Sequence, residues 1–240
     1  MMHKKLRIIQ IFLLLFLIQY NLVVAQDDYT IGSLSHVTVT YTTPQKWTLT
    51  GKLEYRSLFV EGITGQAIED SWRSERIIFA PMISKRITAK GVLGIGWQMQ
   101  AKWDDIEPTE YFIRPQLQYS ISNKYAKYRT THRFLVDVGF EKNEPIVSRL
   151  RYRYNIELPL SGASVDVGEW YIKVGLENIF IYKNPTFSQE IRITPFIGYL
   201  LNKANKLEIG VDYRFTHPFE AKYAHQAWLN LGWFYSITAN

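Results

Sequence analysis

Three arginines at alternate positions, Arg149, Arg151 and Arg153, form the group of residues in this sequence best suited to bind or select a charged ligand. On a β-strand they would stand on one face, about 7 Å apart from one to the next. If that face lines an enclosed space, the guanidinium groups need carboxylates nearby, because an unpaired charge away from water is costly. Such an array either fills a closed interior with ion pairs or forms a constriction that selects solutes by charge.

Carboxylates for these arginines are expected on the segment that precedes them. A turn centred near Glu144–Pro145 would place Arg149 opposite Glu141 and Arg153 opposite Asp137. The prediction assumes an antiparallel hairpin, in which residues equidistant from the turn face each other.

The segment that follows is expected to supply further partners. A turn centred near Val165 would place Arg153 opposite Glu177 and Glu157 opposite Lys173. Arg153 would then sit between two carboxylates on neighbouring strands. The complete predicted charge network comprises Asp137, Glu141, Arg149, Arg151, Arg153, Glu157, Lys173 and Glu177.

The elements that would position these residues show an apolar-polar alternation with a period of two. Apolar and polar side chains alternate in residues 47–60, 90–103, 110–121, 149–160 and 207–215. A helix would scatter these apolar residues around its surface, so the pattern predicts strands. Ile95 and Val211 fall on the apolar faces, whereas Gly94 and Asp212 fall on the polar faces.

Two environments produce such alternation: a soluble sandwich, or a membrane barrel with lipid outside and a polar lumen. The segments run to about ten to fourteen residues, whereas soluble strands usually have five or six and a tilted membrane strand needs about nine to eleven. Aromatic residues also gather near the segment ends, as at Trp47, Trp103, Tyr111, Trp170 and Trp233. The sequence therefore predicts an all-β fold, an antiparallel up-and-down transmembrane β-barrel of about 10–12 strands.

The segment count is about eleven, whereas single-chain bacterial barrels close with an even number of strands. We therefore expect ten or twelve strands. On this expectation, either one further strand exists or residues 33–43 stand outside the wall.

The N-terminus has the layout of a secretory signal peptide. Lys4, Lys5 and Arg7 precede an apolar stretch at 8–18, and Ala25 suits the last position before a cleavage site. The stretch is short for a spanning helix, which needs about 20 apolar residues. We expect residues 1–25 to be a cleaved signal and residues 26–240 to form the barrel. The expected location is the outer membrane of a Gram-negative bacterium, with outer-membrane lipid and the barrel assembly machinery as partners.

Composition excludes several kinds of chemistry. The chain has no cysteine, which removes disulfides, thiolate metal sites and thiol catalysis. Of the 28 Lys and Arg residues, Lys4, Lys5 and Arg7 belong to the expected signal peptide, so residues 26–240 carry 25. Against 22 Asp and Glu this gives a net charge of +3, which indicates no nucleic-acid partner. We expect no cofactor, no metal site and no catalytic residue.

Five segments of the chain resemble a family of bacterial outer-membrane barrels known as domain of unknown function 2490. They read QKWTLTGKLEYRSLF, THRFLVDVGFE, RLRYRYNIELPL, LENIF and LEIGVDYRF. The resemblance covers nearly the whole chain after residue 25. It implies the location and the fold, and it implies no activity or catalytic residue.

These patterns favour a non-enzymatic, structural or narrow-pore (porin-like) barrel with a charged lumen. A barrel of about 10–12 strands lies between eight strands, which side chains fill, and sixteen, which conduct freely, so we expect a filled or very narrow lumen. Two alternatives remain open: a binding platform for a partner or a small solute, and a lipid-modifying enzyme. The enzyme would need a His-Ser pair on the lipid-facing wall, where His132 and His225 are the candidates, although interfacial aromatic roles suit both better.

Overall fold

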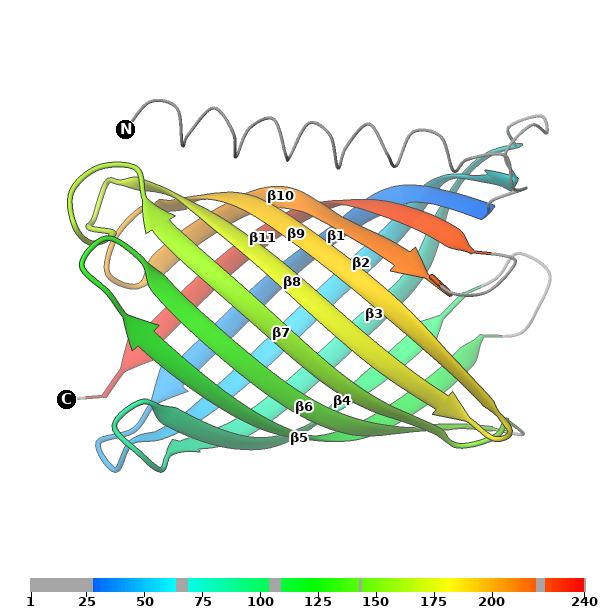
Figure 1. Cartoon of the computed structure of the whole chain (residues 1–240), viewed down its shortest axis with the longest axis horizontal. Helices are drawn as coiled ribbons and strands as arrows, with labels where there is room; N and C mark the ends of the chain where they lie inside the picture. The colour runs from blue at the N-terminus through cyan, green and yellow to red at the C-terminus, as the bar shows by residue number, and fades with distance from the viewer. Residues whose placement is uncertain (1–27, 64–68, 104–108, 143, 219–222, 240) are drawn as a thin grey trace, which may run out of the picture.

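The computed structural model describes residues 28–63, 69–103, 109–142, 144–218 and 223–239, and in these ranges the chain forms a closed β-barrel (Figure 1). The predicted signal peptide, residues 1–25, lies outside the described residues. No helix in the described part of the chain is long and apolar enough to cross a membrane. The strands are β1 (Asp28–Thr42), β2 (Trp47–Ile63), β3 (Glu69–Arg86), β4 (Gly91–Lys102), β5 (Glu110–Lys124), β6 (Arg129–Glu141), β7 (Val147–Pro159), β8 (Trp170–Lys183), β9 (Thr186–Leu200), β10 (Asn205–Thr216) and β11 (Ala224–Thr238).

The barrel closes with an odd number of strands. Each strand pairs antiparallel with its sequence neighbours, and β1 pairs in parallel with β11 from Asp28 opposite Ala224 to Thr42 opposite Thr238. The all-β, up-and-down barrel of about 10–12 strands is therefore confirmed, but the expectation that the number is even, ten or twelve, is wrong. Residues 33–42 belong to a full wall strand, because β1 is hydrogen-bonded on both sides. In a meander of eleven strands the first and last run in the same direction, so only a parallel ladder leaves no free edge.

The two faces of the wall follow the alternation in the sequence. Ile95 is 58% exposed and Val211 is 40% exposed on the exterior, whereas Gly94 is buried and Asp212 is only 5% exposed in the interior. The predicted faces of these residues are confirmed. Successive side chains of a strand point to opposite sides, so each segment exposes its apolar set outward.

Aromatic residues lie on the exterior at both ends of the barrel. Trp47, Trp170 and Trp233 stand at the end that holds the C-terminus, at the left of Figure 1. Tyr111 and Phe187 stand at the opposite end, where β1 begins. We call these the C-terminal end and the N-terminal end of the barrel. Between the two aromatic groups the exterior is mainly aliphatic, including Leu117, Val136, Leu176, Ile193, Ile209, Val211, Leu229 and Leu231.

One part of the interior is apolar. Leu34, Leu58 and Trp228, from β1, β2 and β11, form a buried cluster in which Trp228 is 2% exposed. Gly32 makes room for the indole, since a Cβ at this position would lie 2.5 Å from the Trp228 ring and 2.4 Å from the Ser57 carbonyl oxygen. Strand pairing shifts register beside Gly32, which fits this close approach.

Candidate functional site: the charged lumen

The interior of the barrel encloses a cavity of about 1380 Å³. Its lining extends from Glu144 and Lys183 at the N-terminal end to Arg129 and Glu157 at the C-terminal end. Residues from all eleven strands contribute to it, and most of them are polar or charged. The lumen is therefore not completely filled by side chains.

Glu177, in the middle of β8, is the centre of the densest charge cluster. Its carboxylate is 1% exposed and accepts hydrogen bonds from three arginines: Arg133 at 2.9 Å, Arg151 at 3.0 Å and Arg153 at 2.8 Å. The Nη1 of Arg192 lies 4.0 Å from the same carboxylate. Strands β6, β7 and β9 thus all direct cations at one buried anion.

Asp137 on β6 is the second buried anion of this wall. Arg149 donates two hydrogen bonds to the Asp137 carboxylate, from Nε at 2.7 Å and from Nη2 at 3.2 Å. Arg114 approaches to 3.3 Å and Arg151 to 4.0 Å. Two buried carboxylates therefore have six arginines within 4.0 Å, and Arg151 links the two.

The structure corrects half of the predicted pairing. Arg149 stands opposite Asp137 instead of Glu141, and Arg153 stands opposite Arg133 instead of Asp137. Pairing of β6 with β7 ends at Gly139 opposite Val147, while Glu141 pairs with Phe112 on β5. The hairpin is thus centred two residues before Glu144–Pro145, which moves every partner by four positions. A shift of four keeps each residue on its predicted face, so alternation alone does not detect it.

The pairing predicted across the next hairpin is confirmed. Arg153 stands opposite Glu177, and Glu157 stands opposite Lys173. The side chains then diverge, because Lys173 binds Glu208 on β10 and Glu157 lies 3.8 Å from Arg129. Strand register therefore predicts neighbours on the wall, whereas side-chain length decides which ion pairs form across the lumen.

Six arginines outside the predicted network complete the site. Arg56, Arg114 and Arg214 lie on the polar faces of alternating strands, which is the signal that identifies them in the sequence, whereas Arg76 shares its face of β3 with apolar residues such as Ile78 and Met82. With the three arginines of β7 they form a set that we call the arginine ring, comprising Arg56, Arg76, Arg114, Arg133, Arg149, Arg151, Arg153, Arg192 and Arg214.

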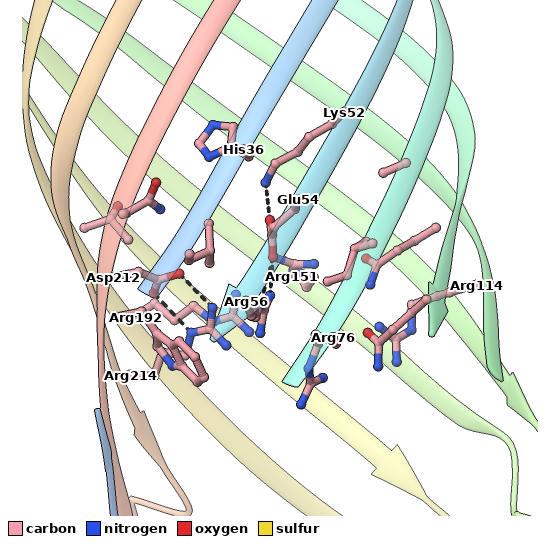
Figure 2. Close-up of a pocket in the computed structure, with 18 of the residues that line it drawn as sticks. His36, Lys52, Glu54, Arg56, Arg76, Arg114, Arg151, Arg192, Asp212 and Arg214 are labelled. Carbon is pink, nitrogen blue, oxygen red and sulfur yellow. Dashed lines mark hydrogen bonds and ion pairs between the residues drawn. The ribbon is translucent and has the colours of Figure 1, made fainter. Parts of the chain in front are cut away.

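The ring extends around the lumen through neighbouring like charges. Arg114 is close to Arg76 on one side and Arg149 on the other. Arg149 and Arg214 are both within electrostatic reach of Arg192. Figure 2 shows the side chains of Arg192 and Arg214 gathered beside Asp212, with Arg56 of β2 near them. Strands far apart in the sequence thus place their guanidinium groups around one space.

A smaller cluster surrounds Glu208, nearer the C-terminal end. The Glu208 carboxylate accepts a hydrogen bond from the Tyr171 hydroxyl at 2.7 Å and binds Lys173 and, at 3.0 Å, Lys206. Phenyl rings flank both ammonium groups, since Lys173 lies 4.7 Å from the Phe196 centroid and Lys206 lies 4.4 Å from that of Phe234. We call these residues the Glu208 cluster.

The two histidines considered for lipid chemistry lie among exterior aromatic residues. His132 Nδ1 is 2.9 Å from the Tyr152 hydroxyl, and His225 Nδ1 is 2.7 Å from the Tyr213 hydroxyl. Stacking rings surround both, with His225 parallel to Phe215 at 5.1 Å. These contacts fit the aromatic role that the sequence favours for both histidines.

Comparison with known proteins identifies a family. Residues 31–225 match the family model described as a protein of unknown function, DUF2490. The chain belongs to this family, as the resemblance of its five segments indicates. Comparison with the curated proteins and with the solved structures finds no match.

Proposed function

We propose that this DUF2490 barrel is a non-enzymatic outer-membrane protein that acts as a narrow pore for small polar solutes. The observation that carries the proposal is a polar cavity whose lining reaches from one end of the barrel to the other, inside a wall with an apolar exterior. A soluble protein rarely exposes so large a continuous apolar surface. An outer-membrane barrel has this inside-out distribution because lipid surrounds it and water enters the lumen.

The proposed location draws on both ends of the wall. Exterior aromatic residues such as Trp47, Trp170 and Tyr111 stand where the interfacial girdles of a membrane barrel would lie. The N-terminal layout of a signal peptide supplies the export route. In this setting the partners are outer-membrane lipid around the aliphatic band and the barrel assembly machinery during insertion.

The lipid-facing band has a direct test. Replacing Val211 by Arg should destabilise the barrel by about 2–4 kcal/mol, because an arginine near the midplane of the bilayer faces hydrocarbon. Urea titration of the protein in lipid vesicles measures the loss. A harmless Val211→Arg substitution, or recovery of the native protein as a soluble periplasmic species, would contradict the location.

Single-channel recording in a planar bilayer tests the pore. We expect the folded protein to give discrete conductance steps smaller than those of sixteen-stranded porins. Heat-modifiable migration on gels first confirms that the preparation is folded. A folded preparation that conducts no ions would overturn the pore function.

Two adjacent residues of β5 provide a matched control. Gln116 lines the cavity, whereas Leu117 is exposed on the exterior. Gln116→Trp should lower the conductance because the indole occupies part of the lumen, and Leu117→Trp should leave it unchanged. Equal effects of the two substitutions would mean that current does not pass through the lumen.

A further inference from the structure

Arginines stand directly opposite arginines at three places on the barrel wall. The pairs are Arg56 with Arg76, Arg133 with Arg153, and Arg192 with Arg214. Like charges directly opposite each other on a sheet are destabilising. This repulsion occurs in three separate strand pairs. Such a repeated destabilising arrangement indicates a functional role for the positive charge in the lumen.

The carboxylates do not balance the cations. Apart from Arg192, which also pairs with Glu190, Asp137 and Glu177 face five arginines, Arg114, Arg133, Arg149, Arg151 and Arg153, which leaves a local excess of 5 − 2 = 3 positive charges. Both carboxylates are 1% exposed, and all five arginines line the cavity. A solute in the lumen therefore meets guanidinium groups, with the carboxylates behind them.

Hydrogen-bond donors are also in excess. Among the described residues, the buried Nε atoms of Arg76, Arg114, Arg133 and Arg153 make no hydrogen bond, although that of Arg114 lies 3.3 Å from Asp137 Oδ1. Buried donors are normally satisfied, and one left without a partner costs about 1–3 kcal/mol. All four atoms belong to the arginine ring. The ring thus has spare donors as well as spare charge.

We propose that the arginine ring is a binding site for a soluble oxyanion of the phosphate type. The planar guanidinium group donates two parallel hydrogen bonds to a phosphate or a carboxylate, a geometry that a monatomic anion does not match. A tetrahedral oxyanion has enough acceptor oxygens to bind guanidinium groups from several strands at once. This inference rests on the proposed pore and names the class of solute that its lumen selects.

Isothermal titration of inorganic pyrophosphate into the purified protein in detergent micelles tests the site. Ionic strength is held constant with potassium chloride, so that general screening does not change. We expect saturable binding of one pyrophosphate per barrel. The double variant Arg133→Gln with Arg153→Gln should bind it roughly tenfold more weakly or worse, because two charge-assisted donors are lost.

An arginine outside the lumen provides the matched control. Arg86 is exposed at the C-terminal end of β3 and donates a hydrogen bond to the Ala89 carbonyl in the following turn, at 3.3 Å. Arg86→Gln makes the same chemical change and should leave the affinity unchanged. Equal affinities for the double variant and Arg86→Gln, or no saturable binding to the native protein, would overturn the proposal.

The double variant should fold, because Glu177 keeps its hydrogen bonds from Arg151. The two substitutions also remove the repulsion between Arg133 and Arg153, which stand opposite each other. If it does not fold, Arg76→Gln on β3 removes a spare donor without touching Glu177, and it should also weaken pyrophosphate binding. Unchanged affinity in that variant would overturn the proposal.

Current recordings separate this inference from the proposed pore. Pyrophosphate should block the conductance of the native protein at concentrations that leave the double variant open. Stoichiometric, arginine-dependent binding without any conductance would support the anion site and refute the pore. Conductance without pyrophosphate binding would support the pore and refute the anion site.

Discussion

The Glu208 cluster and the wall around Glu177 and Asp137 both contain buried carboxylates with cations around them, yet they differ in how completely their hydrogen-bond donors are paired. Glu208 pairs with two lysines, Lys173 and Lys206. Aromatic rings cover both ammonium groups, and Tyr171 occupies a further acceptor position of Glu208. Among the described residues, no buried polar atom of the Glu208 cluster lacks a hydrogen-bond partner.

The wall around Asp137 and Glu177 has unpaired donors as well as an excess of cations. Apart from Arg192, which also pairs with Glu190, five guanidinium groups share Asp137 and Glu177, and three of the five have an Nε that makes no hydrogen bond in the described chain. A cluster that only fills space gains nothing from surplus charge, because each unpaired cation adds desolvation cost. The comparison agrees with our proposal that the arginine ring keeps binding capacity for an oxyanion, whereas the Glu208 cluster holds strands together.

The largest expected effect comes from removing the central anion. Glu177→Gln should destabilise the barrel by about 3–5 kcal/mol, because Arg133, Arg151 and Arg153 lose their buried counter-charge. Glu208→Gln should cost less, about 1–3 kcal/mol, since lysine chains reach water more readily. Urea unfolding in micelles compares the two variants.

Adding pyrophosphate to the same two variants provides a second measurement of their stability. Pyrophosphate should recover part of the stability lost in Glu177→Gln, where it replaces the missing negative charge, and it should not help Glu208→Gln. Equal losses in the two variants, with no recovery in either, would mean that both clusters are simple fillers.

The next effect distinguishes two arginines of β7. Arg149→Ala should cost about 2–3 kcal/mol, because Asp137 loses both of its hydrogen bonds and stays buried. Arg153→Ala should cost less than about 1 kcal/mol, since Glu177 keeps Arg133 and Arg151. Midpoints of urea unfolding measure both changes. The reverse order would contradict the β6–β7 register.

The smallest effect is expected in the Glu208 cluster. Lys206→Met should change the stability by less than about 1 kcal/mol, because Glu208 keeps Tyr171 and Lys173 and the Lys206 side chain is partly exposed. Thermal unfolding measures this change in stability. The reference is Lys203→Met, which makes the same substitution in an exposed turn. A large loss would show that Lys206 holds β10 against β8 and that the cluster lacks spare partners.

The sequence predicted which charged side chains of the site face the lumen, but it predicted only part of their ion pairs. The alternation around Arg149, Arg151 and Arg153 predicts correctly that all three enter the lumen. Their partners depend on register, and a turn placed two residues late pairs Arg149 with Glu141 instead of Asp137. Contacts across the lumen, such as Lys173 with Glu208, join strands that are not neighbours on the wall, so no hairpin rule predicts them.

The sequence by itself determined where the strands lie and which residues face outward, because each segment has its own alternation of apolar and polar residues with a period of two. The same alternation, in long segments, predicted a barrel. Closure was decided only by the tertiary structure. Nothing within β1 or β11 specifies that they pair in parallel, and this pairing makes the strand count odd. The arginine ring is likewise a product of closure, since Arg56, Arg114 and Arg214 meet around one cavity only when eleven strands have curved into a barrel.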